Sequence, residues 1–443
     1  MNKNYIIIEG KKEIFCYKKL VKDFLAENPA VRCKKEFYTY DDETGTFSAT
    51  NLDEIQLEVA RYYERETKAY WSVKINREII EHLRITIPDV EEMEVDKNKI
   101  CLANCVLDLE TGEVFEHSPK FLFLQRSNVI FDEQAKCPQF HKFLDEITMG
   151  NKRRKYSLIE FMGLCMSKQV GIGAAVILKG AGCNGKSVFC NVLCALLGEN
   201  NYTSIVLKDL SSFGTGKIPG KRLLILTEIS KNSSNNIIST ELKQILTGEY
   251  ISVNQKFKPI TDARPFAKVL ILTNHNIGFS EDDSEGALRR VFIIPFEHYV
   301  RPEERDFKLE EKLMEELSGI LNLALKGYRR LVRNGYMYSS KKESDKIIAE
   351  ILRFDNPFRS FVRERIEYSY GNRLPYSKIN RAYIEWCNIQ GINTEKSHEG
   401  YTTNRKMDGR DIFKEISTVY NVERYKSNGE RGLKNISLKQ THD

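Results

Sequence analysis

The fold is decided by the stretch Ala174-Ala175-Val176-Ile177-Leu178-Lys179-Gly180-Ala181-Gly182-Cys183-Asn184-Gly185-Lys186-Ser187, which continues into Val188-Phe189-Cys190-Asn191-Val192-Leu193. An apolar run typical of a buried strand precedes a glycine-rich loop, and a helical pattern follows it. This is the context that a GxxxxGKS phosphate-binding loop requires. A chance glycine turn is the alternative, and the flanking strand and helix disfavour it.

Each residue type in this loop has a chemical role in binding phosphate. Glycines let the backbone wrap closely around phosphates and present its N–H groups, and the N-terminus of the following helix adds a positive dipole end. Lys186 is expected to neutralise β- and γ-phosphate charge, and Ser187 to offer an oxygen to Mg²⁺. The predicted nucleotide contacts are Gly180, Ala181, Gly182, Cys183, Asn184, Gly185, Lys186 and Ser187.

Polar residues follow or precede three further apolar runs. Glu228 follows one strand, where a carboxylate can polarise an attacking water. Asn274 follows another and can orient that water, although asparagine is also a common turn former at strand ends. Arg289 and Arg290 directly precede a third run, and arginine stabilises charge on a transferring phosphoryl group. A surface arginine pair without such a role is the alternative.

The composition is that of a globular protein. The chain has 443 residues, of which 41% are hydrophobic, 29% charged and 10% aromatic. Its length is about three times the ~150 residues of a typical domain. No apolar run approaches the ~20 residues that span a bilayer, and the N-terminus does not resemble a signal peptide. Ten cysteines without metal-site spacing are interpreted as reduced thiols of a cytoplasmic protein.

The charge is unevenly distributed along the chain. The net charge is +6, and residues 351–443 carry 17 lysines and arginines against 12 acidic residues. A basic segment of this kind favours a polyanionic partner such as nucleic acid, because lysine and arginine neutralise phosphates. A solvated surface with a chance asymmetry remains the alternative.

The pattern of apolar runs predicts an α/β fold in three domains. Residues 1–150 mix short strands and helices and are expected to form an α+β domain. Within residues 151–340, buried strands alternate with helical stretches, which indicates a largely parallel sheet. Residues 350–443 read as a small basic domain. The expected buried strands are 174–178, 223–226, 269–272 and 291–294.

The last segment has the pattern of a winged helix. Helices are expected at residues 356–368, 376–390 and 408–420, followed by a hairpin at 422–438. Such a domain can place its third helix in a major groove and lay the hairpin along the phosphates. A structural or partner-docking domain is the alternative. The candidate DNA-binding residues are Arg405, Lys406 and Arg410 before or at the start of the third helix, and Lys426, Arg431 and Lys434 on the hairpin.

Taken in order, these motifs resemble those of superfamily III helicases. The branch is the helicase part of phage and plasmid primase-helicases and mobile-element replication proteins. The resemblance covers residues 95–300 well and the remainder loosely, and residues 104–113 and 137–140 resemble the lead-in of this branch. The motifs that carry it are Gly180–Ser187, Leu223–Glu228, Leu246–Glu249 with Lys256, Thr273–His275 and Arg289–Phe296.

The resemblance implies an AAA+ ATPase core that assembles as a ring, usually a hexamer, and moves 3′ to 5′ along single-stranded DNA. It implies that Lys186 and Ser187 contact ATP and Mg²⁺, and that Glu228 supports hydrolysis and the metal. Asn274 matches the polar sensor, and Arg289 or Arg290 matches the finger that reaches a neighbouring subunit's ATP. Residues 244–259 match a pore hairpin, on which Lys256 and Lys258 would touch DNA phosphates.

Two positions depart from the family pattern. Thr227 stands where some relatives carry a second acid, so Mg²⁺ is expected to rely on Ser187 and water. Leu288 stands where relatives often have Trp. About 150 residues precede the ATPase region, without a strand ending in Asp-x-Asp for a two-metal polymerase site, so primer synthesis is not expected. A separate primase or loader is a possible partner.

The function expected from the sequence is therefore a ring-forming, ATP-dependent replicative DNA helicase of a phage, plasmid or mobile element. It would act on single-stranded and double-stranded DNA. An origin-binding initiator that uses ATP as an assembly switch is the alternative, motivated by the basic C-terminal segment. A phosphate-loop kinase or packaging ATPase is disfavoured by the compact order of motifs and by Arg289-Arg290.

Overall fold

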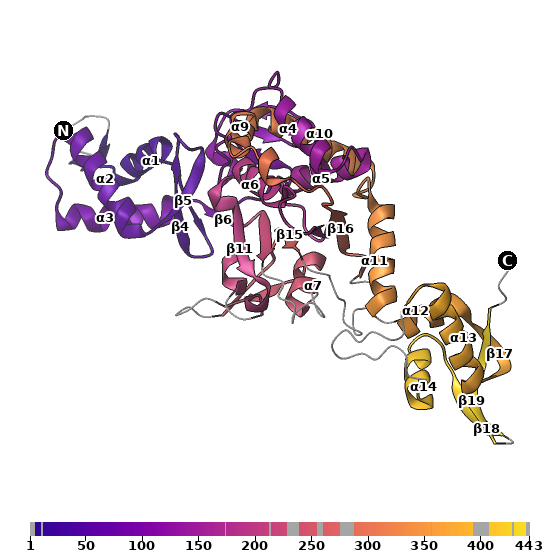
Figure 1. Cartoon of the computed structure of the whole chain (residues 1–443). Helices are drawn as coiled ribbons and strands as arrows, with labels where there is room; N and C mark the ends of the chain where they lie inside the picture. The colour runs from indigo at the N-terminus through magenta and orange to yellow at the C-terminus, as the bar shows by residue number, and fades with distance from the viewer. Residues whose placement is uncertain are drawn as a thin grey trace. The chain divides into compact units, whose positions relative to one another are not determined.

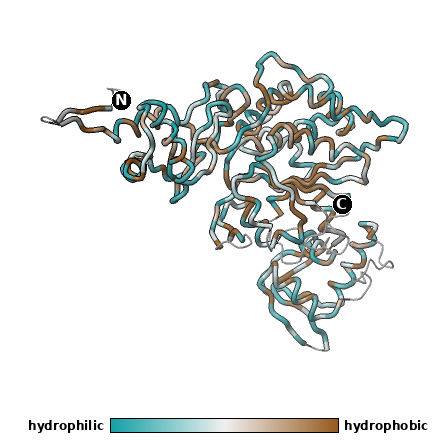
Figure 2. The backbone as a smooth tube through the Cα atoms, turned by 90° about the vertical axis from the view of Figure 1, so that its left-hand side faces the viewer, coloured by the Kyte–Doolittle hydropathy of each residue, from teal (hydrophilic) through white to brown (hydrophobic). Residues whose placement is uncertain are grey.

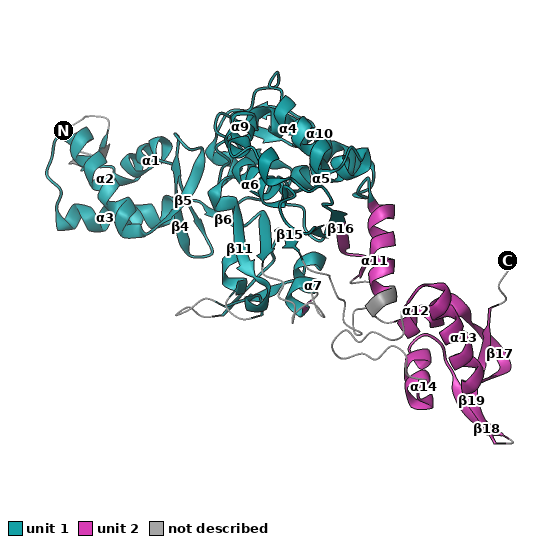
Figure 3. Ribbon diagram, viewed as in Figure 1, with its two compact units in different colours: residues 1–228, 240–274, 294–340 teal, residues 229–239, 275–293, 341–443 magenta. Residues whose placement is uncertain are grey.

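The chain was analysed as a computed structural model. It describes residues 5–9, 12–172, 174–211, 214–227, 239–254, 260–274, 288–355, 357–392, 407–427 and 429–439. The chain divides into two compact units (Figure 3). The first unit comprises residues 1–228, 240–274 and 294–340, and the second comprises residues 229–239, 275–293 and 341–443.

A five-stranded sheet carries the glycine-rich loop, and its strands lie in the order β11-β12-β15-β10-β16 (Figure 1). The pairs β10/β15, β12/β15 and β11/β12 are all parallel, as the sequence predicts. All but the last residue of β10, β12 and β16 are buried, which explains their unbroken Val, Ile and Leu runs. Figure 2 shows hydrophobic residues gathered along these strands. The strands are β10 (Ala175–Lys179), β11 (Tyr202–Val206), β12 (Leu223–Thr227), β15 (Lys268–Thr273) and β16 (Val291–Pro295).

Helices that precede and follow these strands complete the α/β part. Between α5 and α10 the backbones approach closely, because a Cβ on Gly163 would lie 2.3 Å from the Ala324 carbonyl oxygen. A Cβ on Gly327 would lie 2.4 Å from the Ile159 carbonyl oxygen. The α-helices are α4 (Pro138–Ile147), α5 (Lys152–Cys165), α6 (Lys186–Leu197), α7 (Thr240–Thr247), α9 (Leu309–Glu315) and α10 (Leu317–Arg333). Short 3-10 helices are η3 (Glu199–Asn201), η4 (Leu207–Asp209), η5 (Gly214–Lys217) and η7 (Pro302–Glu304).

The N-terminal part of the first unit contains three small sheets, of which the largest has the order β5-β4-β3-β6. Hairpins are formed by β4 with β5 and by β8 with β9, and Gly45 and Gly112 lie in their turns with φ of 70° and 82°. Its helices are α1 (Tyr17–Glu27), α2 (Leu52–Thr67), α3 (Val73–Thr86) and the 3-10 helix η2 (Pro119–Phe121). Its strands are β1 (Ile6–Glu9), β2 (Lys12–Phe15), β3 (Ala30–Cys33), β4 (Glu36–Asp41), β5 (Thr46–Thr50), β6 (Asp89–Val90), β7 (Lys99–Cys101), β8 (Val106–Asp108) and β9 (Val114–Phe115).

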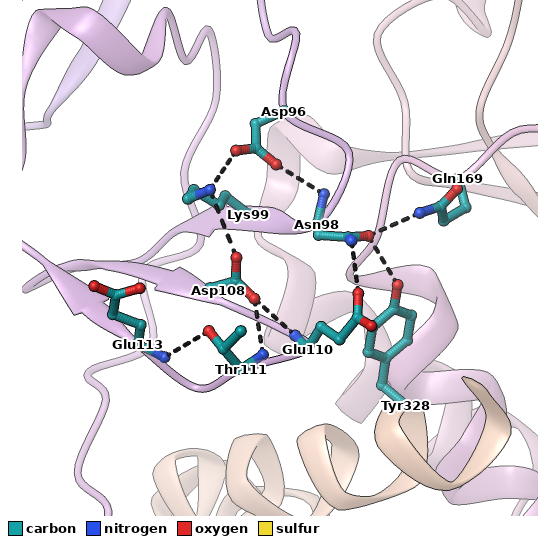
Figure 4. Close-up of polar contacts among 9 residues, drawn as sticks. All are labelled: Asp96, Asn98, Lys99, Asp108, Glu110, Thr111, Glu113, Gln169 and Tyr328. Carbon is teal, nitrogen blue, oxygen red and sulfur yellow. Dashed lines mark hydrogen bonds and ion pairs between the residues drawn. The ribbon is translucent and has the colours of Figure 1, made fainter. Parts of the chain in front are cut away.

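A polar network joins the β7–β9 sheet to the helical part of the first unit (Figure 4). The Asn98 side-chain amide donates to Glu110 Oε2 at 3.0 Å. Its oxygen accepts from Gln169 Nε2 at 2.8 Å and from the Tyr328 hydroxyl at 3.0 Å. Tyr328 is fully buried on α10, so this one amide connects three segments that are distant in sequence.

Asp108 ends β8 and serves as a turn former in the same view (Figure 4). Its carboxylate accepts from the backbone N–H groups of Glu110 and Thr111 at 3.0 and 2.9 Å, and Lys99 Nζ lies 3.5 Å away. In the part of the chain that the structure describes, no three His, Cys, Asp or Glu side chains gather as a metal site would need.

The C-terminal segment forms a three-stranded antiparallel sheet in the order β17-β19-β18, packed with helices around one apolar core. The fully buried residues Phe361, Ile379, Ile412 and Ile436 come from four different elements of this core. The elements are α11 (Lys341–Asp355), α12 (Pro357–Arg365), β17 (Ile366–Pro375), α13 (Tyr376–Ile389), α14 (Gly409–Ser417), β18 (Glu423–Ser427) and β19 (Glu430–Leu438).

The prediction of a helix over residues 356–368 is wrong at the C-terminal end of that range. Helix α12 ends at Arg365, and residues 366–375 form β17, a strand absent from the prediction. Ile366 pairs with Leu438 and Leu374 with Leu433, about 60 to 70 residues along the chain. A strand whose partner is so distant carries little local signal.

Two expectations drawn from composition can be compared with the structure. All ten cysteines are free, as expected for thiols outside disulfides. Among the described residues, no helix is both long and apolar enough to cross a membrane.

Candidate nucleotide-binding site

The glycine-rich loop connects the end of β10 at Lys179 to the start of α6 at Lys186. Three of its residues have left-handed backbone conformations, with φ of 104° at Gly182, 48° at Cys183 and 85° at Gly185. A Cβ on Gly185 would lie 2.6 Å from Ile147 Cγ2, so glycine is needed there for space as well as for conformation. The loop is thus shaped by its sequence and closely supported by α4.

Lys186 is buried at the first position of α6 and points back over its own loop. Its Nζ donates to the Gly180 carbonyl oxygen at 2.8 Å and to Asn184 Oδ1 at 2.9 Å. Burial lowers the pKa of its ammonium group, and the two oxygens that accept these hydrogen bonds are neutral. A bound phosphate would give this ammonium a negatively charged partner, which neither of the two neutral oxygens provides. The neighbouring Ser187 is exposed in the first turn of α6.

Asn184 joins the loop to the chain that follows β16. Its side-chain oxygen accepts from Lys186, and its Nδ2 donates to the Phe296 carbonyl oxygen at 2.9 Å. The side chain is buried, so both hydrogen bonds are shielded from water. The sequence predicts Asn184 only as a loop residue in contact with nucleotide, whereas the structure shows that it positions the lysine.

The end of β15 lies directly beside the start of the loop. Lys179 pairs with Thr273 in the parallel register, and the Gly180 N–H donates to the Thr273 carbonyl oxygen at 3.1 Å. Asn274 is the next residue and is exposed at this same edge of the sheet. The structure therefore brings Asn274 to the loop, as expected from parallel strands whose carboxyl ends meet at one edge.

Thr227 ends β12, the neighbour of β15 in the sheet. Glu228 follows it in the sequence and lies outside the described residues. Of the two sequence-predicted polar residues at the strand ends, Asn274 is thus located beside the loop, and the role of Glu228 stays a prediction.

Arg289 and Arg290 lie directly before Val291, the first residue of β16. Arg289 is exposed and Arg290 is half-buried. The phosphate loop contacts the opposite end of this strand, because the Phe296 N–H donates to the Lys179 carbonyl oxygen at 2.7 Å.

The segment expected to form a pore hairpin contains two short antiparallel strands, β13 (Ile251–Val253) and β14 (Thr261–Ala263). Ile251 pairs with Ala263 and Val253 with Thr261. Lys256 and Lys258 fall between these strands in the sequence and lie outside the described residues. The two strands are consistent with a hairpin, and the contacts of its lysines stay predictions.

A hollow of about 610 Å³ lies in the C-terminal segment, between the start of α14 and the β18–β19 hairpin. Four of its lining residues are cationic, and Asp408 is its one acid, which accepts from the Arg410 N–H at 3.1 Å as the N-cap of α14. The lining residues are Tyr376, Asp408, Gly409, Arg410, Arg424, Tyr425, Lys426 and Arg431. The hollow therefore has the charge of an anion-binding surface.

This hollow brings together three of the predicted DNA-binding residues, Arg410, Lys426 and Arg431, all of them exposed. Lys434 is placed differently: it pairs in register with Glu423, its Nζ lies 3.3 Å from that carboxylate, and it does not line the hollow. Arg405 and Lys406 lie outside the described residues.

Arg424 was missed by sequence reasoning. Its guanidinium lies over the Phe413 ring, 4.0 Å from the centroid, and it also lines the hollow. The signal that could have found it is the alternation of β18, which points Arg424 and Lys426 to the same face of the hairpin.

A parallel strand, a glycine-rich loop and a helix that begins with a buried lysine define a mixed α/β domain with a phosphate-loop arrangement. Two family models match separate regions of the chain. One described as "D5 N terminal like" matches residues 14–149, and one described as "Family of unknown function (DUF5906)" matches residues 178–290. The second match takes in the loop and the strand ends described above.

Comparison with curated proteins finds a viral relative. The chain is 23% identical over 342 residues to "Putative helicase L207/L206" of Acanthamoeba polyphaga mimivirus. The match takes in 66% of this chain and 35% of that protein. The chain therefore corresponds to about a third of the length of this relative.

Comparison with solved structures finds the same fold over nearly the whole chain. The apo structure of the NrS-1 C terminal region has a TM-score of 0.54 at 14% identity, covering 95% of this chain and 99% of that one. The A form apo structure of the same region has a TM-score of 0.52 at 14% identity, covering 94% and 97%. The chain thus shares its fold with the NrS-1 C terminal region.

Proposed function

We propose that the protein is an ATP-dependent DNA helicase that acts in replication. The observation that carries this proposal is the phosphate loop, in which the buried ammonium of Lys186 rests on two neutral oxygens. The mimivirus relative is named as a putative helicase, and this name favours a helicase over a kinase.

The core is proposed to be of the AAA+ type, in the superfamily III branch. The strand order supports this, because β10, which precedes the loop, lies between β15 and β16 in the sheet. In this proposal Lys186 and Ser187 hold the phosphates and Mg²⁺, with Glu228 as the acid for the metal and for water, and Asn274 as the polar sensor. The exposed Ser187 hydroxyl and the buried lysine fit such a ligand.

Ring assembly, as a hexamer, is proposed from the position of the arginine pair. Arg289 and Arg290 directly precede the first residue of β16. Arginine stabilises charge on a transferring phosphoryl group, and in this proposal the pair serves the ATP held by a neighbouring subunit. An active site shared between two subunits requires that the chains assemble.

Mixing two inactive variants tests this shared site. Lys186→Ala and Arg290→Ala are each expected to hydrolyse ATP poorly alone. In an equal mixture, about a quarter of randomly formed interfaces pair an intact lysine with an intact arginine, so activity should return to about that fraction of wild type. ATPase assays on the mixture measure this, with Arg289→Ala tested in the same way.

An arginine that acts within its own chain would give a different result. Every subunit in the mixture would then lack one essential group, and the mixture would be as inactive as its components. Recovery with only one of the two arginine variants would identify the finger.

The DNA contacts are proposed to come from two places. Lys256 and Lys258, between β13 and β14, would touch the single strand in the ring. The C-terminal segment would act as a winged helix and hold duplex DNA along its hollow, because four cations line it against one capping acid. The proposal also includes translocation from 3′ to 5′ and an origin in a phage, plasmid or mobile element. It further includes a cytoplasmic location and a separate primase or loader.

Neutralising the hollow should weaken duplex binding and reduce its dependence on salt. Arg410→Ala, Lys426→Ala and Arg431→Ala are each expected to lower affinity several-fold and to reduce the slope of log K against log salt by about 1. Fluorescence anisotropy across a salt series measures both quantities. Lys378→Ala, an exposed lysine on α13, serves as the matched control and should leave the slope unchanged.

Unchanged slopes for all three hollow variants would contradict the duplex-binding role of this surface. They would leave the ATPase proposal intact, since that rests on residues that do not line the hollow.

An origin-binding initiator is the second candidate, and the cationic hollow is the observation that favours it. The two functions predict different behaviour on forked DNA. A helicase unwinds it with ATP and is stimulated by single strands of any sequence, whereas an initiator binds one duplex sequence tightly without unwinding. Unwinding and DNA-stimulated ATPase assays on the wild-type chain therefore discriminate between them.

A further inference from the structure

The chain that follows β16 is attached to the phosphate loop at three points. The Phe296 N–H donates to the Lys179 carbonyl oxygen at 2.7 Å, and the Val300 N–H donates to the Cys183 carbonyl oxygen at 2.9 Å. Asn184 Nδ2 donates to the Phe296 carbonyl oxygen at 2.9 Å. Residues 296–300 therefore lie along the loop and bring the next residues of the chain close to it.

Arg305 makes a fourth contact, through its side chain. Its Nη2 donates to Cys183 Sγ at 3.0 Å, and both residues are exposed. A thiol is a weak acceptor for a guanidinium, which pairs best with carboxylate or phosphate. Within the described residues, no ion pair joins Arg305 to a carboxylate.

This choice of partner is informative because acids surround Arg305 in the sequence. Asp306 instead pairs with Lys312 at 2.6 Å, and Glu310 accepts from Asn191 Nδ2 at 3.1 Å. The arginine is thus directed to the third variable position of the loop, away from the neighbouring carboxylates.

The loop therefore has two cations from two different elements, and both rest on neutral acceptors. Lys186 contacts carbonyl and amide oxygens from inside the loop, and Arg305 contacts the Cys183 thiol from its outer side. A polyphosphate in the loop would be a stronger acceptor for both. The planar guanidinium can also bind phosphate oxygens in a bidentate manner.

We propose that Arg305 binds the polyphosphate of the nucleotide held by the loop of its own chain. The inference rests on the proposed ATPase function and adds a binding residue to it. It assigns different roles to the arginines: Arg305 strengthens nucleotide binding within one subunit, and Arg289 or Arg290 acts across the subunit interface.

Nucleotide-binding measurements on the Arg305→Ala and Arg305→Lys variants of the 443-residue chain test this role. Competition against a fluorescent ATP analogue should show ATP and ADP binding about 10- to 100-fold more weakly to Arg305→Ala, with Arg305→Lys in between. Adenosine, which has no phosphate, should displace the fluorescent analogue equally well from both variants and from the wild-type protein. Arg301→Ala, an exposed arginine of the same segment, is the matched control and should bind ATP as wild type does.

Adenosine separates phosphate binding from a merely structural contact. If Arg305 only secured the segment through the thiol, Arg305→Ala would weaken adenosine binding as much as ATP binding. In our proposal the thiol is only the partner in the absence of phosphate, so Arg305→Ala should lose affinity for ATP and ADP and keep its affinity for adenosine.

The possible outcomes distinguish a failure of the proposed role of Arg305 from a failure of the proposed ATPase function. Wild-type ATP affinity in Arg305→Ala, with Lys186→Ala impaired, would overturn the role of Arg305 and preserve the ATPase. An equal loss of ATP and adenosine binding would also overturn it, since the effect would not involve phosphate. Failure of the wild-type chain to bind ATP at all would overturn both.

Discussion

Lys186→Ala is expected to lower ATP hydrolysis at least about 100-fold, because it removes the cation that would face the nucleotide phosphates. DNA unwinding should be lost with it. The fold should survive, since among the described residues Lys186 donates to Gly180 O and Asn184 Oδ1, both in its own loop. Burial lowers the pKa of this lysine, so its removal relieves an unfavourable buried charge. Steady-state ATPase assays and thermal unfolding measure the two effects.

An exposed lysine on the neighbouring helix provides the control. Lys142 lies on α4 with 76% of its side chain exposed, so Lys142→Ala removes the same charge without touching the loop. It should keep wild-type ATPase activity. Full unwinding by Lys186→Ala would overturn the proposed mechanism, and a collapse of its melting temperature would show that the lysine stabilises the fold instead.

Gly327→Ala is expected to destabilise the protein by about 2–4 kcal/mol, the reverse of the usual effect in a helix. Alanine normally stabilises a helix by about 1 kcal/mol relative to glycine. Here the added Cβ would lie 2.4 Å from the Ile159 carbonyl oxygen and 2.6 Å from its carbonyl carbon. These are backbone atoms of α5, so no rotamer change relieves the overlap and the two helices must separate.

Chemical denaturation of Gly327→Ala and of Lys326→Ala measures this effect. Lys326 is the exposed neighbour on the same helix, and its replacement should change the free energy of unfolding by less than about 0.5 kcal/mol. A Gly327→Ala protein as stable as wild type would mean that α5 and α10 are not held at this close approach.

Much of the sheet could be predicted from local sequence. The runs that form β10, β12, β15 and β16 are unbroken and apolar because these strands are buried on both faces. The edge strand β11 was not expected, since most of its residues are only partly buried and its sequence contains Thr and Ser. Burial produces the signal and an edge position alone does not remove it, because β16 at the other edge of the sheet is buried and has an unbroken apolar run.

In the C-terminal segment, too, one part could be predicted from local sequence and another could not. Its hairpin was predicted because a turn with glycine separates two short alternating strands, and β18 and β19 are paired as expected. Strand β17 was missed because its partner is distant in sequence, so the helical pattern of α12 was extended too far. Local turns leave a mark in the sequence, and long-range pairing leaves much less.

For the candidate site, the sequence alone determined the loop, its lysine and its serine, because phosphate binding needs these residue types at a set spacing. Only the tertiary structure decided what surrounds them: that Asn184 links Lys186 to Phe296, and that Arg305 reaches Cys183. The reason is physical. A tight loop is specified by neighbouring residues, whereas contacts across 100 or more residues depend on how the strands are ordered in the sheet.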